Sequence, residues 1–114
     1  MTHLEDRRRS PRIPCDLAMQ YEIKGVGPRT GRIMNIGTGG VLLNTRGAIP
    51  SVGDHVLLRF HLPLSKREIE TAGKVRWSTE GQAGVEFAQL GLLQQDEIWR
   101  YYARESARQR QLRS

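Results

Sequence analysis

Cysteine, aromatic residues and long apolar runs are all scarce in this chain. Its single cysteine, Cys15, excludes an internal disulfide and suits a reducing compartment. No apolar run approaches the roughly 18 residues that a membrane-spanning helix needs. The opening "MTHLEDRRRS" is polar and lacks the apolar segment of a signal peptide. We therefore expect a cytoplasmic protein that is not inserted into a membrane.

The length and the charge limit the possibilities further. A chain of 114 residues predicts one domain, because two would each be too small for a good core. The balance of 18 Lys and Arg against 12 Asp and Glu gives a net charge of +6, which favours anionic partners. The basic residues gather toward the two ends of the chain: Arg7, Arg8, Arg9 and Arg12, then Arg100, Arg104, Arg108, Arg110 and Arg113.

Short segments of alternating apolar and polar residues, separated by turn residues, run through most of the chain. They predict strands over residues 17–23, 32–36, 41–45, 55–63, 69–78 and 83–88. From residue 91 to 112 the period becomes helical, and the apolar stripe fades after Tyr102. The prediction is an all-β fold, a six-stranded antiparallel β-barrel, with a C-terminal helix that is docked by its first half only.

Catalytic and metal-binding patterns are not apparent in the sequence. His3, His55 and His61 are scattered and lack the Cys or acidic neighbours of a metal site. Cys15 has no organised His partner, so we expect a small, half-buried residue rather than a nucleophile. The stretch "GTGG" is not followed by the Lys of a phosphate-binding loop. We expect no enzyme, no metal and no cofactor.

The first stretch that could bind a ligand is "RRRSPR", Arg7 to Arg12. Pro11 and Pro14 favour an extended chain, in which Arg8 and Arg12 point the same way. The arginine fork pairs with phosphate oxygens and with the O6 and N7 atoms of guanine, and its flat face stacks on a base. The alternative for this stretch alone is a disordered basic arm.

The second stretch is "NIGTGGVLL", Asn35 to Leu43. The side-chain carbonyl of Asn35 can accept a hydrogen bond from the N1–H or N2–H of guanine, which an arginine cannot do. The glycines allow a ligand to approach the backbone closely and permit positive φ angles. The alternative for this stretch alone is an ordinary glycine-rich hairpin.

Together, the two stretches resemble the motifs of the PilZ domain family. The residues from Arg8 to Arg12 match its RxxxR motif, and those from Asn35 to Gly40 fall where the family carries (D/N)xSxxG. "GKVRW" (73–77) and "AGVEFAQL" (83–90) also look like the late strands of the family. The resemblance extends from Glu5 to about Tyr102.

This resemblance implies a six-stranded barrel that binds cyclic di-GMP and signals to a protein partner. Residues 1–14 would be a mobile segment that closes over the ligand, residues 15–88 the barrel and residues 91–112 the helix. Arg8 and Arg12 would clamp the ligand, Asn35 would recognise guanine and Gly40 would form the turn. Arg9 and Arg76 are further candidates.

Two details of the motifs bear on how the ligand would bind. Arg7 matches an extra arginine that in some members accompanies an intercalated pair of ligand molecules, so we expect two per protomer. Gly37 replaces the motif serine. Its missing hydroxyl predicts weaker binding, by up to roughly tenfold, although its backbone N–H would be free to serve.

Two other functions remain open at this stage. The first is a PilZ-type adaptor without a ligand, which acts only through protein–protein contacts and is favoured by Gly37. The second is a non-specific nucleic-acid binder that uses both basic ends. Its stacking aromatics would have to be Trp99, Tyr101 and Tyr102, which the apolar stripe assigns to the docked half of the helix. We therefore do not expect nucleic acid as a partner.

Overall fold

The computed structural model describes residues 12–45 and 50–113, and it contains the predicted antiparallel barrel and helix. The strands close in the order β1-β2-β3-β6-β5-β4, and every neighbouring pair is antiparallel. The elements are β1 (Ile13–Ile23), β2 (Gly27–Ile36), β3 (Gly40–Thr45), β4 (His55–His61), β5 (Glu68–Thr79), β6 (Gln82–Phe87) and α2 (Leu92–Arg113).

Two strands begin earlier than the sequence pattern indicates. β1 starts at Ile13, so Pro14 is already paired with Asn35 of β2. β2 starts at Gly27 rather than Arg32, because the preceding turn is short. Gly25 and Gly27 have φ angles of 82° and 88°, a left-handed conformation that glycine adopts at little cost, and the chain reverses within a few residues.

The interior of the barrel consists of the alternate residues of each strand. On β1 the inward residues include Met19, Tyr21 and Ile23, which follow the alternation of apolar and polar residues in this strand. On β4 the alternation Val56, Leu58 and Phe60 is likewise buried. Burying each large aliphatic or aromatic side chain stabilises the fold by roughly 1.5–3 kcal/mol. This core holds in place the start of β1 and the β2–β3 turn, where Arg12 and the second motif lie.

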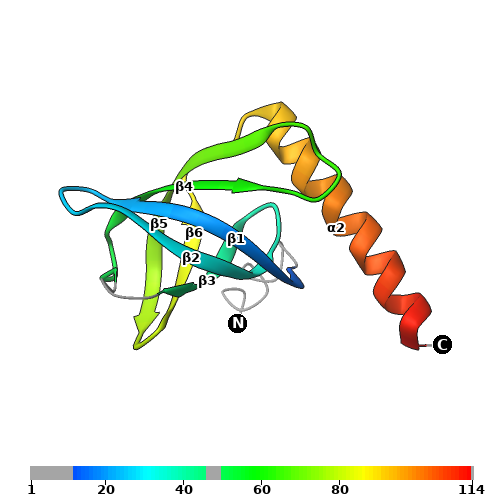
Figure 1. Cartoon of the computed structure of the whole chain (residues 1–114), viewed down its shortest axis with the longest axis horizontal. Helices are drawn as coiled ribbons and strands as arrows, with labels where there is room; N and C mark the ends of the chain where they lie inside the picture. The colour runs from blue at the N-terminus through cyan, green and yellow to red at the C-terminus, as the bar shows by residue number, and fades with distance from the viewer. Residues whose placement is uncertain (1–11, 46–49, 114) are drawn as a thin grey trace, which may run out of the picture.

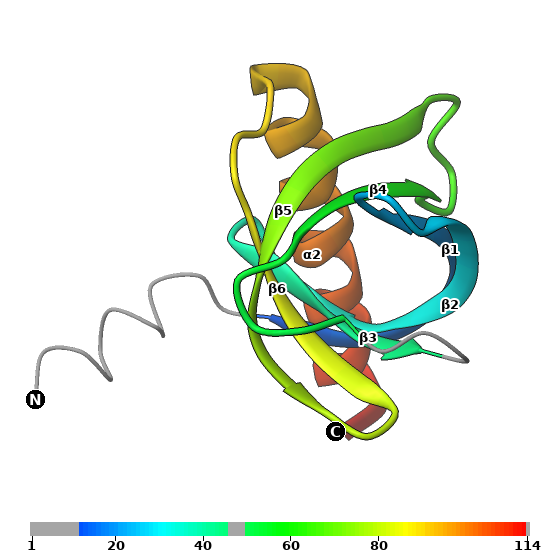
Figure 2. The ribbon, with the colours of Figure 1, turned by 90° about the vertical axis from the view of Figure 1, so that its left-hand side faces the viewer.

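Helix α2 lies across one end of the barrel (Figures 1 and 2). Ile98 and Tyr101 are buried and belong to the same core cluster as the strands. Farther along, Arg104 Nη2 donates to the carbonyl of Pro63 over 3.1 Å, and Gln109 Nε2 donates to the carbonyl of Pro14 over 3.5 Å. The described part of the chain contains no helix long and apolar enough to cross a membrane.

We expected all aromatic residues in the first half of the helix to pack against the barrel, and this prediction is wrong for Trp99. Trp99 is 53% exposed, and Leu93, near the start of the helix, is 63% exposed. Each helical residue turns the side-chain direction by about 100°. Trp99, which follows the fully buried Ile98, therefore points away from the core.

Candidate ligand-binding site

The start of β1 lies beside the end of β2, which brings parts of the two motifs together. Ile13 is paired with Ile36 and Pro14 with Asn35. Arg12 therefore lies next to the turn between β2 and β3. A Cβ atom built on Gly40 would be 3.2 Å from Arg12 Nη2, so the guanidinium lies directly against this glycine.

The turn from Gly37 to Gly40 is tied down by backbone hydrogen bonds. The N–H of Gly37 donates to the carbonyl of Gly40 over 3.0 Å, and the N–H of Phe87 donates to the carbonyl of Gly39 over 2.9 Å. The expectation that the Gly37 N–H is free is therefore wrong. It closes the turn and is not available to a ligand unless the turn opens.

The glycine at position 40 is required by close packing, not by an unusual φ angle. A Cβ atom there would be 2.2 Å from the carbonyl oxygen of Val85 on β6. The described glycines with positive φ are Gly25, Gly27, Gly53 and Gly81, none of them in this turn. Gly40 begins β3, and it lets β3 and β6 approach each other beneath Arg12.

Asn35 carries a buried acceptor without a donor. Among the described residues, its Oδ1 atom is one of two buried side-chain oxygen or nitrogen atoms that make no hydrogen bond. An unsatisfied buried polar group costs about 1–3 kcal/mol. An N–H group of a ligand would remove this cost if the neighbouring turn moves enough to admit it.

Charged side chains surround Gly40 on the outer face of the barrel. Glu86 is the register partner of Gly40. Arg76 donates two hydrogen bonds to Glu86 Oε1, from Nε over 2.9 Å and from Nη2 over 2.5 Å. Burial lowers the pKa of Arg12, and the carboxylate of Glu86 acts in the opposite direction. Glu86 is therefore paired with Arg76 and attracts Arg12 electrostatically, and the two guanidinium groups on this patch suit an anion.

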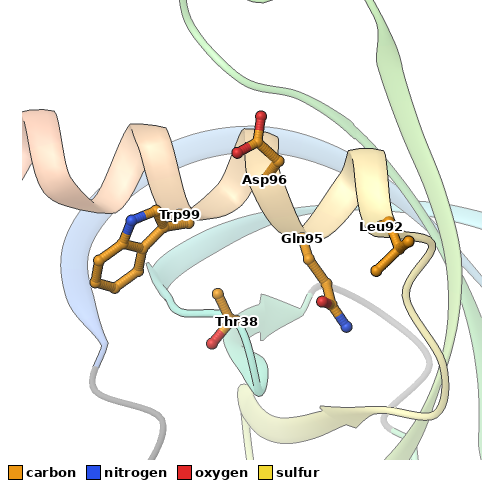
Figure 3. A pocket seen from close by; sticks show the side chains of 5 residues that line it. All are labelled: Thr38, Leu92, Gln95, Asp96 and Trp99. Carbon is orange, nitrogen blue, oxygen red and sulfur yellow. The ribbon is translucent and has the colours of Figure 1, made fainter.

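Two hollows separate helix α2 from these motif residues, with volumes of about 590 and 440 Å³. The larger lies between the start of β1 and the helix, and its lining includes Arg12, Pro14, Trp99 and Tyr102. The smaller lies beside the β2–β3 turn and is lined by Thr38, Leu92, Gln95, Asp96 and Trp99 (Figure 3).

The structure thus brings Arg12, Asn35, Gly37 and Gly40 to one edge of the barrel, with Arg76 beside them. Arg7, Arg8 and Arg9 lie outside the described residues. The motifs do not point to three further residues beside the site: Thr38, Glu86 and Trp99. A helical projection of α2 could have identified Trp99, because a tryptophan next to a core isoleucine cannot share its direction.

The described residues contain no cluster of three or more His, Cys, Asp or Glu that could hold a metal. His55 and His61 are both exposed. Cys15 is half-buried, as expected, and burial raises the pKa of its thiol to about 11. The thiol is therefore protonated at neutral pH and is a poor nucleophile.

Three solved structures share this fold at low sequence identity. The inhibitor of motility of Bacillus subtilis (MotI/DgrA) is 22% identical with a TM-score of 0.78, over 91% of this chain and 53% of that chain. The chain thus spans about half the length of that protein. The PilZ domain of CeSA from a cellulose-synthesizing bacterium is 18% identical with a TM-score of 0.65, over 83% and 97% of the two chains.

The third is the PilZ domain of YcgR from Escherichia coli, solved with c-di-GMP. It is 12% identical with a TM-score of 0.71, over 95% of this chain and 99% of that domain. A comparison with curated proteins finds no match. The family model of the PilZ domain matches residues 6–104, which include both motifs, all six strands and the first half of α2. The chain therefore belongs to the PilZ domain family.

Proposed function

We propose that this chain is a receptor domain for cyclic di-GMP. The observation that carries the proposal is the position of Arg12, whose guanidinium lies against Gly40 and lines a hollow beside the helix. An arginine of the first motif thus meets the backbone of the second. The YcgR domain, which has the same fold, was solved with this ligand.

The two motifs supply the different groups that this ligand needs: donors from the arginines and an acceptor from Asn35. Arg12, together with Arg8, would pair with the phosphates and with the O6 and N7 acceptors of guanine. The unsatisfied Oδ1 of Asn35 would accept from the donor edge of a guanine, which no arginine can recognise. Arg76 would strengthen the positive field if the ligand displaces it from Glu86.

The consequences of binding form part of the same proposal. The predicted mobile segment ended at residue 14, but Ile13 and Pro14 already belong to β1, so only the residues before Arg12 close over the ligand. The surface that results is recognised by a protein partner in the bacterial cytoplasm. Arg7 supports an intercalated pair of ligand molecules rather than one. No catalytic step is involved, because the signal consists of the changed surface.

A second candidate, an adaptor that binds no nucleotide, is supported by one observation. Gly37 lacks the hydroxyl of the motif serine, and its N–H is already bonded to the carbonyl of Gly40. While the turn stays closed, Gly37 therefore offers a ligand neither a hydroxyl nor a free N–H group. In that case the arginines would act only in protein–protein contacts.

Thermal unfolding with and without nucleotide distinguishes the two candidates. A ligand that binds only the folded state stabilises it by about 2.7 kcal/mol when its concentration is 100 times Kd. We expect cyclic di-GMP to raise Tm and cyclic di-AMP, which lacks the guanine edge, to leave it unchanged. An unchanged Tm with both nucleotides would favour the adaptor, and an equal rise with both would exclude recognition of guanine.

A further inference from the structure

Trp99 is a large aromatic residue that the fold itself does not use. Its neighbour Ile98 is fully buried and Tyr101 is 5% exposed, whereas Trp99 is 53% exposed. Burial of Ile98 and Tyr101 holds this turn of α2 against the barrel. The backbone at Trp99 is therefore held in place, but much of the apolar surface of the indole faces solvent.

Trp99 lies between the two hollows that separate the helix from the motif residues. It lines the larger one together with Arg12 and the smaller one together with Thr38 of the β2–β3 turn. In Figure 3 the indole and Gln95 come from the helix, and Thr38 comes from the turn. A single side chain of α2 thus borders both the arginine of the first motif and the turn of the second.

A neighbouring ring holds the indole in position. Tyr102 stacks on Trp99 with a centroid distance of 5.6 Å and an interplanar angle of 18°. Tyr102 is partly buried and packs against the core. A ring supported on one side in this way loses little conformational freedom when a second flat ring stacks on its other side.

We propose that Trp99 is a base-stacking residue, which receives a guanine ring of the same ligand whose phosphate Arg12 holds. This inference rests on the proposed function and extends the site onto helix α2. A nucleotide combines a flat base with a nearby anionic phosphate. The larger hollow combines an indole with a guanidinium, which are the groups that bind these two parts.

The lining of the smaller hollow fits the edge of a base. Thr38, Gln95 and Asp96 supply hydroxyl, amide and carboxylate groups next to the indole. Asp96 is already paired with Arg100 over 2.9 Å, so the carboxylate is held in place. A purely apolar occupant would make no use of these polar groups, whereas the donors and acceptors of guanine can bind to them.

Calorimetric titration of cyclic di-GMP into matched variants tests this inference. Trp99→Leu keeps an apolar side chain without a flat ring, and Trp99→Phe keeps a ring. Leu93→Ala is the control, because Leu93 is 63% exposed on the same helix and lines neither hollow. Stacking on one base predicts that Trp99→Leu weakens binding by roughly five- to a hundredfold. Trp99→Phe should lose clearly less, and Leu93→Ala nothing.

The outcomes separate this inference from the function on which it rests. No binding by the unaltered chain would overturn the receptor proposal itself. Binding by the unaltered chain with an unchanged Kd for Trp99→Leu would overturn only the role of Trp99. Equal losses for Trp99→Leu and Trp99→Phe would also overturn it, because the ring would not be what the ligand contacts. Because Trp99 is exposed, the empty variants should unfold near the Tm of the unaltered chain.

Discussion

The guanidinium of Arg12 lies against Gly40. A Cβ atom built on this glycine would be only 3.2 Å from Arg12 Nη2. The two residues are far apart in the sequence and belong to different motifs. Their contact follows from the pairing of β1 with β2, which places Pro14 opposite Asn35. The barrel therefore holds the last arginine of the first motif in position in the absence of a ligand.

Replacing Arg12 tests whether this arginine binds or supports the fold. Arg12→Ala should abolish measurable binding of cyclic di-GMP. It should leave the Tm of the empty protein nearly unchanged, because much of the residue is exposed although its guanidinium packs against Gly40. Arg12→Lys, which keeps the charge and loses the planar fork, should bind weakly. Calorimetry and thermal unfolding measure the two effects. A large fall in Tm for Arg12→Ala would show that the arginine is structural.

Glu86 tests the electrostatics of the site. Its carboxylate is paired with Arg76 and attracts Arg12 electrostatically, so it competes with the phosphates of a ligand for both guanidinium groups. Glu86→Gln should tighten binding by a few-fold, in keeping with the modest strength of exposed ion pairs, about 0.2–1 kcal/mol. The gain should shrink as salt is added. Weaker binding would mean that the carboxylate itself accepts a hydrogen bond from the guanine.

Gly40 tests the close approach of β3 and β6. A methyl group at this position would be 2.2 Å from the carbonyl oxygen of Val85. This oxygen belongs to the backbone of β6, which cannot move aside as a flexible side chain can. Gly40→Ala should lower the free energy of unfolding by roughly 1–3 kcal/mol, the usual cost of overpacking. It should also weaken binding, because Arg12 and the turn would shift apart.

The matched control for Gly40 is Gly91→Ala. A Cβ atom at Gly91 would meet only Gln94 Oε1, at 3.8 Å. Denaturant titration should therefore show a clearly smaller loss for Gly91→Ala than for Gly40→Ala. Equal losses would contradict the steric explanation for Gly40.

The thiol of Cys15 predicts how stability depends on alkaline pH. Burial raises its pKa from the usual 9.0 to about 11, so the folded state holds the proton more firmly than the unfolded chain. This contribution to stability is complete below pH 9 and is lost as the pH rises toward 11. Denaturant titrations of the unaltered chain and of Cys15→Ala across this range measure it. The unaltered chain should lose stability more steeply, and parallel curves would contradict the assignment.

The barrel was predictable because the alternation of apolar and polar residues records which face of each strand is buried. The faces of β1 and β4 follow directly from this pattern. The start of β1 was less predictable. Pro14 indicates an extended chain but does not reveal that it is paired, since the register with Asn35 depends on a long-range contact.

The contacts of the candidate site were less predictable than the fold. The glycines of the β2–β3 turn suggested positive φ angles, but Gly40 is needed because Val85 approaches it from another strand. The hydrogen bond that occupies the Gly37 N–H, and the position of Trp99 beside the motifs, likewise depend on tertiary packing. The motifs indicate which residues lie close together, but their contacts and distances depend on the tertiary fold.

Isothermal titration of cyclic di-GMP into the unaltered chain, with cyclic di-AMP as the control, decides whether this domain is a receptor. We expect saturable heat with the guanine nucleotide alone, and a stoichiometry of two if Arg7 supports an intercalated pair. No heat with either nucleotide, at protein concentrations high enough to detect weak binding, would exclude the receptor and leave an adaptor that acts without a ligand.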